Sequence, residues 1–492
     1  MAELDPRLPV IVGVGQRLER DGGLDPVSLI VDAARAAAAD AGAPALLDGL
    51  DTVATVPIVS WRYADGARAT ADALGLDGDA VTTLYPSMGG NTPQMLVNRV
   101  AERIVAGDSD LALVCGGEAY RTRMRAKRGG AHLDWLKQDP AMRPDWTDSE
   151  TFDMGHPAEL ALGIMMPTQC YPLFENALRH ESGRTAAEHT AAVAELWAGF
   201  AAVAAANPDA WDRSGPTAAE IATVTETNRM VGFPYTKRMV SNPDVDMASA
   251  VVVCSVERAR ALGIPADRWV FLHAGTDGKD PYLSERPSFT RSGSIRHAGR
   301  AALELAGVGI DDVAHLDVYS CFPSAVEIAC AELGIDRDRP LTTYGGLCFG
   351  GGPWNNPVGH ALATMVAALR DDPGSFGLVT ANGGNIQKHA FGVYSTRPPA
   401  AGFRTAHPQA AIDAEGTVAV LDAHQGPATV EAWTVMHERD GSMARGHAVV
   451  RTPDGARAWA VTRDADLMAL MEVEDLVGAA ASVGPDAELR LG

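Results

Sequence analysis

Two stretches of this chain repeat the same order of local patterns, and this repeat restricts the fold more than any other feature of the sequence. Residues 30–58 begin as an alanine-rich helix, break at Gly42, turn through acidic residues and end in a β-branched strand. Residues 300–319 follow the same order, with the break at Gly307 and a strand at 315–319. A helix, a glycine and an apolar strand in this order are typical of one unit of an α/β sheet.

A second pair of segments repeats with nearly the same spacing. An apolar strand precedes Gly117, and another precedes Gly384. Gly307 follows Gly42 by 265 residues, and Gly384 follows Gly117 by 267 residues. One register relates both pairs, which predicts two α/β halves, each a sheet of nearly continuous apolar strands flanked by helices. Helices, glycine turns and apolar strands are also common in unrelated α/β proteins, so a chance repeat stays open at this point.

The sequence outside the repeat predicts two further units. The interval 120–239 is rich in Arg, Pro, Trp and Met and contains a helix over 186–205, so we expect an inserted subdomain rather than a loop. After Pro399, strand patterns alternate with Asp-Gly turns, and we expect an antiparallel appendage that forms a small barrel. Its predicted strands are 416–421, 428–437, 442–452 and 456–462. The predicted domains are the N-terminal half (1–119 and 240–262), the insert (120–239), the C-terminal half (263–400) and the appendage (405–492).

Charge and cysteine content exclude several classes of protein. The 492 residues carry 63 acidic and 41 basic side chains, a formal net charge of -22. Nucleic acids and anionic membranes attract positively charged surfaces, so neither is an expected partner. We find no signal peptide and no run of the roughly 18 apolar residues that a membrane helix needs. The six cysteines lack the spacing of a disulfide framework or a zinc site. We therefore expect a cytoplasmic protein with no metal and no tightly bound cofactor.

Four short motifs stand in a characteristic order along the chain. They are Ser87-Met88-Gly89-Gly90-Asn91-Thr92, Tyr319-Ser320-Cys321-Phe322, Gly345-Gly346-Leu347 leading to Asn356-Pro357-Val358-Gly359, and Ala381-Asn382-Gly383-Gly384. By their order and spacing they resemble the thiolase superfamily, and most closely its thiolase-like proteins type 1. The resemblance runs from Pro9 to about Pro398, and the appendage is similar to the extra domain of the type 1 proteins.

The resemblance implies a fold and a chemistry. The implied α/β fold is the thiolase fold, a duplicated five-layer αβαβα arrangement, with an inserted loop subdomain and an extra C-terminal antiparallel β-barrel of OB-like form. The active site of such enzymes lies where the two halves meet. One cysteine takes the acyl group from a CoA thioester, and a second cysteine transfers the proton. Two further polar residues, including the histidine of a Gly-His-Pro loop, help build an oxyanion hole.

This sequence differs from the family at both cysteine positions and at the first-loop histidine. The nucleophile position holds Ser87, whose hydroxyl is a weaker nucleophile than a thiol unless a base lies beside it. A hydrogen-bond donor to a bound thioester and a cap of the helix that begins near Thr92 are the other roles open to Ser87. The first-loop histidine position holds Tyr319, and Ala381 replaces the second cysteine, two residues before Gly383.

The Gly-His-Pro loop has two alignments, and both lose the histidine. An ungapped alignment places Gly352 at this position, and an alignment with a four-residue insertion places Asn356 there. We prefer Asn356, because Pro357 then stands in the first turn of the following helix, where proline is favoured. An amide at this position can donate a hydrogen bond to an oxyanion.

Five basic residues form the densest positive cluster in this acidic chain. They are Arg121, Arg123, Arg125, Lys127 and Arg128, and the first four alternate, which places them on one face if the segment is extended. The resemblance implies that CoA lies against the inserted subdomain. We predict that the cluster binds the CoA phosphates. A solvated segment paired with neighbouring acids is the alternative.

Three functions follow from these patterns. The first is an acetyl-CoA acetyltransferase of the superfamily. The second is an aldolase-like lyase that uses Tyr319, with Tyr344 in reserve, as acid and base on a CoA thioester. The third is a non-catalytic acyl-CoA binding protein of lipid metabolism. All three use CoA or acyl-CoA as the ligand. The family implies a homodimer, but an extra domain could cover the dimer surface, so a monomer stays open.

Overall fold

The computed structural model describes residues 4–148 and 154–492. Residues 1–3 of the predicted N-terminal half and residues 149–153 of the predicted insert lie outside this description. A ten-stranded mixed sheet forms the body of the described chain, in the order β3-β2-β4-β7-β1-β8-β11-β10-β9, with β12 beside β8. Its strands are β1 (Pro9–Leu18), β2 (Thr52–Thr55), β3 (Thr82–Leu84), β4 (Leu111–Ala119), β7 (Asp246–Ser255), β8 (Val270–Lys279), β9 (Val313–Asp317), β10 (Phe376–Gly383), β11 (Lys388–Ser395) and β12 (Arg404–Ala406).

The two halves of this sheet have the same topology, which confirms the repeat. The halves join at its centre, where β1 and β8 pair antiparallel. In the first half, β7 pairs antiparallel with β1, and β4 pairs antiparallel with β7. In the second half, β11 pairs antiparallel with β8, and β10 pairs antiparallel with β11. The next pairs, β4 with β2 and β10 with β9, are both parallel. The predicted strand at 315–319 is shifted, because β9 ends at Asp317 and leaves Tyr319 in the loop beyond it.

The predicted glycine breaks end the helices that follow β1 and β8. Helix α1 (Pro26–Asp40) begins at the Asp25 cap, whose side chain accepts hydrogen bonds from the amides of Val27 and Ser28. Gly42 after α1 and Gly307 after α10 (Gly293–Ala306) both have left-handed backbone, with φ of 70° and 72°. Glycine adopts this conformation at little cost, so the same residue type ends the equivalent helix in each half.

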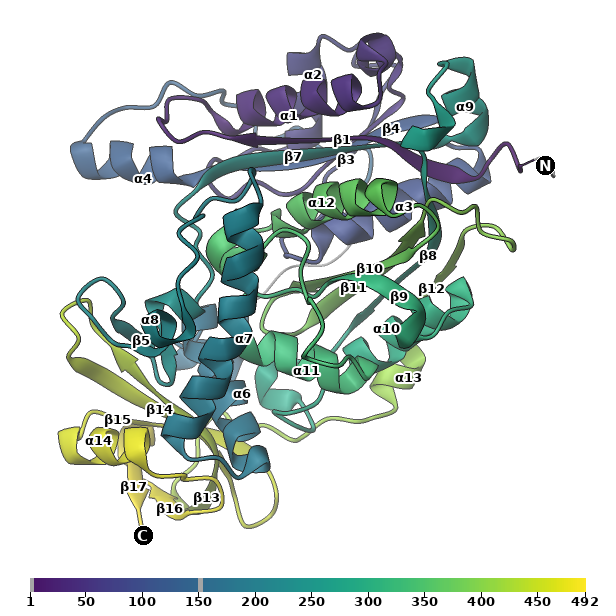
Figure 1. Ribbon diagram of the computed structural model, residues 1–492. Helices are drawn as coiled ribbons and strands as arrows, with labels where there is room; N and C mark the ends of the chain where they lie inside the picture. The colour runs from purple at the N-terminus through teal and green to yellow at the C-terminus, as the bar shows by residue number, and fades with distance from the viewer. Residues whose placement is uncertain (1–3, 149–153) are drawn as a thin grey trace.

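Helices cover both outer faces of the sheet and fill the space between its halves (Figure 1). Helices α1 and α2 (Gly66–Leu74) lie over the first half, and α10 and α11 (Pro323–Leu333) lie over the second. Helices α3 (Thr92–Ala106) and α12 (Pro357–Asp371) lie between the two, with buried faces that contact strands of both halves. The predicted starts of these two helices, near Thr92 and at Pro357, are correct.

The insert between β4 and β7 is mainly helical. Its elements are α4 (Tyr120–Gly129), α5 (Pro157–Ala161), α6 (Pro167–Ser182), α7 (Ala186–Ala206), α8 (Ala218–Ala222), β5 (Met230–Gly232) and β6 (Tyr235–Thr236), and α9 (Val256–Ala261) follows β7. The predicted helix over 186–205 is α7. Among the described residues it is the one helix whose length and composition would allow it to cross a membrane. It instead packs Phe200 and Ala204 against Gly345 and Gly346, so its apolar residues serve this contact.

The C-terminal appendage is a second antiparallel sheet, but it does not close into the predicted barrel. Its order is β15-β14-β13-β16-β17, and β5 and β6 of the insert join it at β13. A single bridge between Val461 and Glu488 links the β15 and β17 ends, so within the described chain no ladder closes the sheet. The predicted strand at 416–421 is also wrong, since only Val420 makes a bridge there. The elements are α13 (Gln409–Asp413), β13 (Gly426–His437), β14 (Met443–Arg451), β15 (Arg457–Thr462), α14 (Ala465–Val473), β16 (Ala480–Val483) and β17 (Leu489–Leu491).

The outer edge of β3 is covered by the chain's own insert. Trp146 pairs with Leu84 as a short parallel bridge. Its amide donates to the Thr83 carbonyl at 3.0 Å, and its carbonyl accepts from the Tyr85 amide at 3.0 Å. Asp145 accepts a further hydrogen bond from the Thr83 amide at 2.8 Å. An exposed strand edge is a template for pairing with another chain, and here those backbone groups are already paired.

Candidate functional site

Loops from both halves meet at the N-terminal end of α3. A Cβ atom at Gly90 would overlap the Tyr319 hydroxyl and the Asn382 carbonyl, and one at Gly383 would overlap the Asn91 side chain. The Gly89 amide also donates to the side chain of Asn355 at 3.1 Å. The structure therefore brings three predicted motifs together. It places Gly90, rather than Ser87, against Tyr319.

Ser87 lies at the edge of this meeting point and is hydrogen-bonded on both sides. Its hydroxyl donates to the Asp148 carboxylate at 2.7 Å, and its amide donates to the other oxygen of that carboxylate at 2.7 Å. The Lys388 ammonium donates to the Ser87 hydroxyl at 3.2 Å. Sequence reasoning missed Asp148 and Lys388, which lie 61 and 301 residues from Ser87 along the chain. No local motif indicates either contact.

Ser87, Asp148 and Lys388 line a polar cavity of about 590 Å³. Its other walls come from α3, the end of β8, the start of β11 and the segment after β12. Hydrogen bonds to Asp277 and Glu102 raise the pKa of His407 to about 10, so this imidazole is charged at neutral pH. Burial lowers the pKa of His389 to about 4, so its ring is neutral. The cavity therefore presents charges of both signs and one neutral imidazole.

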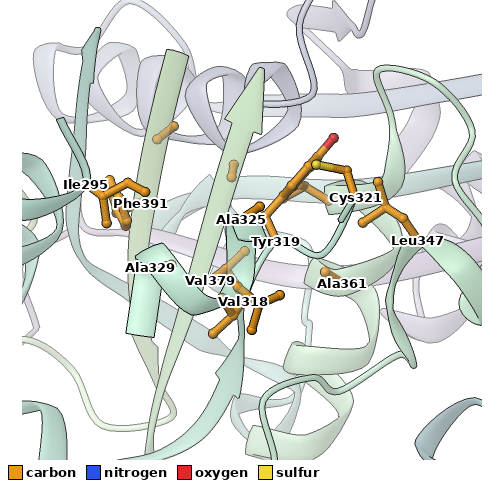
Figure 2. Packing of buried hydrophobic residues seen from close by; sticks show 14 of the residues in the cluster. Ile295, Val318, Tyr319, Cys321, Ala325, Ala329, Leu347, Ala361, Val379 and Phe391 are labelled. Carbon is orange, nitrogen blue, oxygen red and sulfur yellow. The ribbon is translucent and has the colours of Figure 1, made fainter. Parts of the chain in front are cut away.

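Tyr319 is buried and does not line the large cavity. Figure 2 shows its ring among the packed core side chains, close to Cys321 and Val318. Burial, then the nearby Cys321, raises its pKa well above the usual range, so the phenol stays protonated. It lines a cavity of about 10 Å³, which is room for roughly one water molecule and not for a substrate. The neutral ring of His389 lines both this small cavity and the large one.

Asn356 and Tyr344 are held by structural hydrogen bonds. The Asn356 amide donates to the Gly116 carbonyl at 2.8 Å and to Ser249 at 2.9 Å. The Tyr344 hydroxyl is buried and makes one long contact, 3.5 Å, with the Gly351 carbonyl. Neither side chain lines the Ser87 cavity. Asn355 rather than Asn356 contacts the Gly89-Gly90 loop.

No cysteine is placed for nucleophilic chemistry beside Ser87. All six thiols are free and buried, and none lines the 590 Å³ cavity. Burial raises the pKa of Cys115, Cys254, Cys321 and Cys330 to about 12, and it raises the pKa of Cys170 and Cys348 as well. Because the thiolate is the reactive form, buried thiols of this kind are inert.

The predicted basic cluster is a helix, not an extended segment. Arg, Lys, Ala and Met favour helix, and α4 carries the cluster until Gly130 ends it with φ of 67°. The five cations therefore do not share one face. Arg121 lies 5.4 Å from the Trp211 ring, Arg123 turns toward a second cavity, and the remaining three are exposed. Those three are Arg125, Lys127 and Arg128.

A buried cluster of Glu175, His189 and Glu327 joins α6, α7 and α11. Their potential ligand atoms lie within 4.8 Å of one another. The His189 ring is 2.5 Å from Glu175, which is a hydrogen-bond separation, and Tyr235 donates to Glu175 at 2.6 Å. Burial, then the charge of Glu175, raises the pKa of Glu327 to about 8. Arg337 pairs with the other side of Glu327, and the group ties the insert to the second half.

This topology, two equivalent α/β halves with their loops meeting at α3, is that of the thiolase superfamily. The chain is 34% identical, over 100% of both chains, to the monomeric SCP2-thiolase-like protein type 1 from Mycobacterium smegmatis, with a TM-score of 0.84. Residues 408–488 match the model of the thiolase-like protein type 1 additional C-terminal domain. The chain therefore belongs to the SCP2-thiolase-like proteins type 1.

Two more distant structures share the fold. An acetyl-CoA acetyltransferase from Syntrophomonas wolfei is 18% identical, with a TM-score of 0.55 over 80% of this chain and 100% of its own. The Ltp2-ChsH2 aldolase is 20% identical, with a TM-score of 0.59 over 80% of this chain and 99% of its own. No curated protein sequence matches the chain significantly.

The Glu327 network predicts a pH dependence of stability. Its folded pKa of about 8 is raised above the usual carboxyl value, so its stabilising contribution is complete below about pH 4.5 and is lost as the pH rises through about 8. Glu327→Gln should therefore flatten the fall in melting temperature between pH 5 and pH 8, by on the order of a few degrees. Glu226→Gln, which removes an exposed carboxyl, is the control. Equal slopes for the native protein and Glu327→Gln would contradict the assignment.

Proposed function

We propose that this protein binds an acyl-CoA thioester and does not pass the acyl group through a cysteine. The observation that carries this proposal is the environment of Ser87. A hydroxyl, and not a thiol, faces the 590 Å³ cavity at the nucleophile position, held between a carboxylate and an ammonium group. Kinship with acetyl-CoA acetyltransferases supports a CoA thioester as the ligand.

Asp148 lies where a base could take the Ser87 proton, but Lys388 donates a hydrogen bond to the same oxygen, and we take this donation to favour binding over nucleophilic attack. The single hydroxyl proton of Ser87 is donated to Asp148, and one lone pair accepts from Lys388. In this arrangement the ammonium of Lys388 supplies the positive charge that would polarise a thioester carbonyl in the cavity. The exposed cations of α4 add a local positive field that would attract the CoA phosphates to an otherwise acidic protein.

A carbon–carbon lyase is the second candidate. The Ltp2-ChsH2 aldolase shares the fold, and His389 lines both the Ser87 cavity and the small cavity at Tyr319. We propose that a movement of this ring connects the phenol with the larger space. Tyr319 would then act as the acid on a β-hydroxyacyl-CoA.

We also propose that the protein acts as a monomer in the cytoplasm. The backbone groups at the outer edge of β3 are paired with Trp146 and Asp145 of the same chain, which leaves that edge no template for a second copy. Six free cysteines are typical of a reducing compartment.

Intact-mass measurement with acetyl-CoA tests the main proposal. The native protein should bind acetyl-CoA by calorimetry and keep an unmodified mass. Ser87→Cys should acquire an acetyl adduct, because Lys388 would stabilise the new thiolate beside the bound thioester. Ser87→Ala is the matched control and should stay unmodified. An adduct on the native protein, or binding of acetyl-CoA to none of the three proteins, would overturn the proposal.

Tyr319→Phe tests the lyase candidate. The variant removes only the phenol oxygen, so acetyl-CoA affinity should change by less than about twofold while cleavage of a β-hydroxyacyl-CoA falls by about a hundredfold or more. The assay follows release of the aldehyde or ketone. If the native protein cleaves no such thioester, or if the variant cleaves it at the native rate, the lyase candidate fails.

A further inference from the structure

The wall of the Ser87 cavity is polar along most of its length. Met95 and Trp146 supply the hydrophobic side chains among the described residues that line it. The Arg99 guanidinium lies over the Trp146 ring, 4.9 Å from the ring centre, so this ring carries a cation on one face. Among the described residues, Met95 is therefore the main hydrocarbon surface that an acyl group in the cavity would contact.

One face of α3 supplies much of this wall. Met95, Asn98, Arg99 and Glu102 recur at intervals of three or four residues, which places their side chains on the same side of the helix. Most apolar residues of α3 are instead buried in the core. The helix between the two packed halves therefore keeps a largely polar face where it borders the cavity.

Four charged side chains of this wall contact one another in alternating sign. Arg99 donates to Glu102 at 3.3 Å, Glu102 lies 3.5 Å from the charged ring of His407, and this ring donates to Asp277 at 2.8 Å. The side chains stay partly exposed, from 25% for Glu102 to 55% for His407. Water therefore solvates these charges from the open side of the cavity.

A hydrocarbon chain laid over these charges would remove their water and give nothing in return. Taking water from a charged group costs free energy unless new hydrogen bonds replace the lost ones, and methylene groups form none. In an apolar tunnel, by contrast, each added methylene would raise the affinity about fourfold. The character of the wall therefore determines which kind of acyl group binds.

Two buried polar side chains of the cavity each have an atom without a hydrogen-bond partner among the described residues. The atoms are Oδ1 of Asn91, a residue that is 8% exposed, and Nε2 of His389, which is 3% exposed. Asn91 follows Ser87 by four residues and His389 directly follows Lys388, so both lie near the expected thioester. An unpartnered buried acceptor is costly, and a ligand hydroxyl can donate to it.

We infer that the Ser87 cavity selects a short acyl group that bears a hydroxyl and excludes long hydrocarbon acyl groups. The inference rests on the proposed function, because it takes the thioester to lie beside Ser87 and Lys388. A cavity of about 590 Å³ has room for a longer chain, so the polarity of the wall rather than its size sets the limit. The face of α3 that carries Arg99 and Glu102 is then the specificity-determining surface.

Calorimetry on the full chain with a series of CoA thioesters tests the inference. Octanoyl-CoA should bind no more than about twofold more tightly than butyryl-CoA, whereas an apolar tunnel would favour the longer chain by more than about a hundredfold. 3-Hydroxybutyryl-CoA differs from butyryl-CoA only by its hydroxyl, and it should bind about threefold more tightly or better.

A matched pair of double variants tests the role of α3. Arg99→Leu with Glu102→Leu removes two opposite charges and makes this part of the wall apolar, so the octanoyl-to-butyryl affinity ratio should rise by about tenfold or more. Asp32→Leu with Arg35→Leu removes an ion pair of the same spacing on α1, outside the cavity. This control should leave the ratio within about twofold of the native value.

The outcomes separate this inference from the proposed function. If acetyl-CoA binds and the affinity rises with each added methylene, the inference is overturned and the proposed function stands. Equal affinities for butyryl-CoA and 3-hydroxybutyryl-CoA, or an unchanged ratio in the Arg99 and Glu102 variant, also overturn the inference alone. If none of the thioesters binds to the native protein, the inference and the proposed function both fail.

Discussion

The close approach of two backbone loops at the N-terminal end of α3 determines the rest of the site. Gly89 and Gly90 from the first half press against Tyr319, Asn382 and Gly383 from the second, with no room for a Cβ atom at Gly90 or Gly383. Because interiors are packed at the density of crystals, this contact leaves no substrate-sized space between the loops. The 590 Å³ cavity lies beside the contact instead, at Ser87, Asn91 and Thr92.

The close contact of the two loops explains which reactive side chains are buried and which line a cavity. Deep burial keeps the phenol of Tyr319 protonated, and it keeps all six cysteines as thiols rather than as the reactive thiolates. Charged groups line the cavity beside this contact, as in the Asp148 and Lys388 contacts of Ser87. The segment of the insert that carries Arg143, Asp145 and Asp148 contributes to the second cavity, covers the β3 edge and then contributes to the Ser87 cavity.

Sequence patterns predicted the parts of the fold that depend on local periodicity and on glycine and proline. The equivalent breaks at Gly42 and Gly307, the long helix α7 and the start of α12 at Pro357 are of this kind. The sequence could not show that the appendage stays open, because closure depends on a β15–β17 ladder that no turn or local pattern specifies. The α4 cluster was assigned to an extended segment because alternating cations fit either geometry until the glycine at residue 130 is weighed. Asp148 and Lys388 were missed because only the tertiary structure, through the path of the insert and the placement of β11, brings them to Ser87.

A crystal structure of the protein soaked with acetyl-CoA tests the account most directly. The account predicts an intact thioester beside Ser87 and Lys388 and no covalent bond to the protein. An acetyl group bound to the protein, or a thioester that lies away from Ser87 and Lys388, would contradict it.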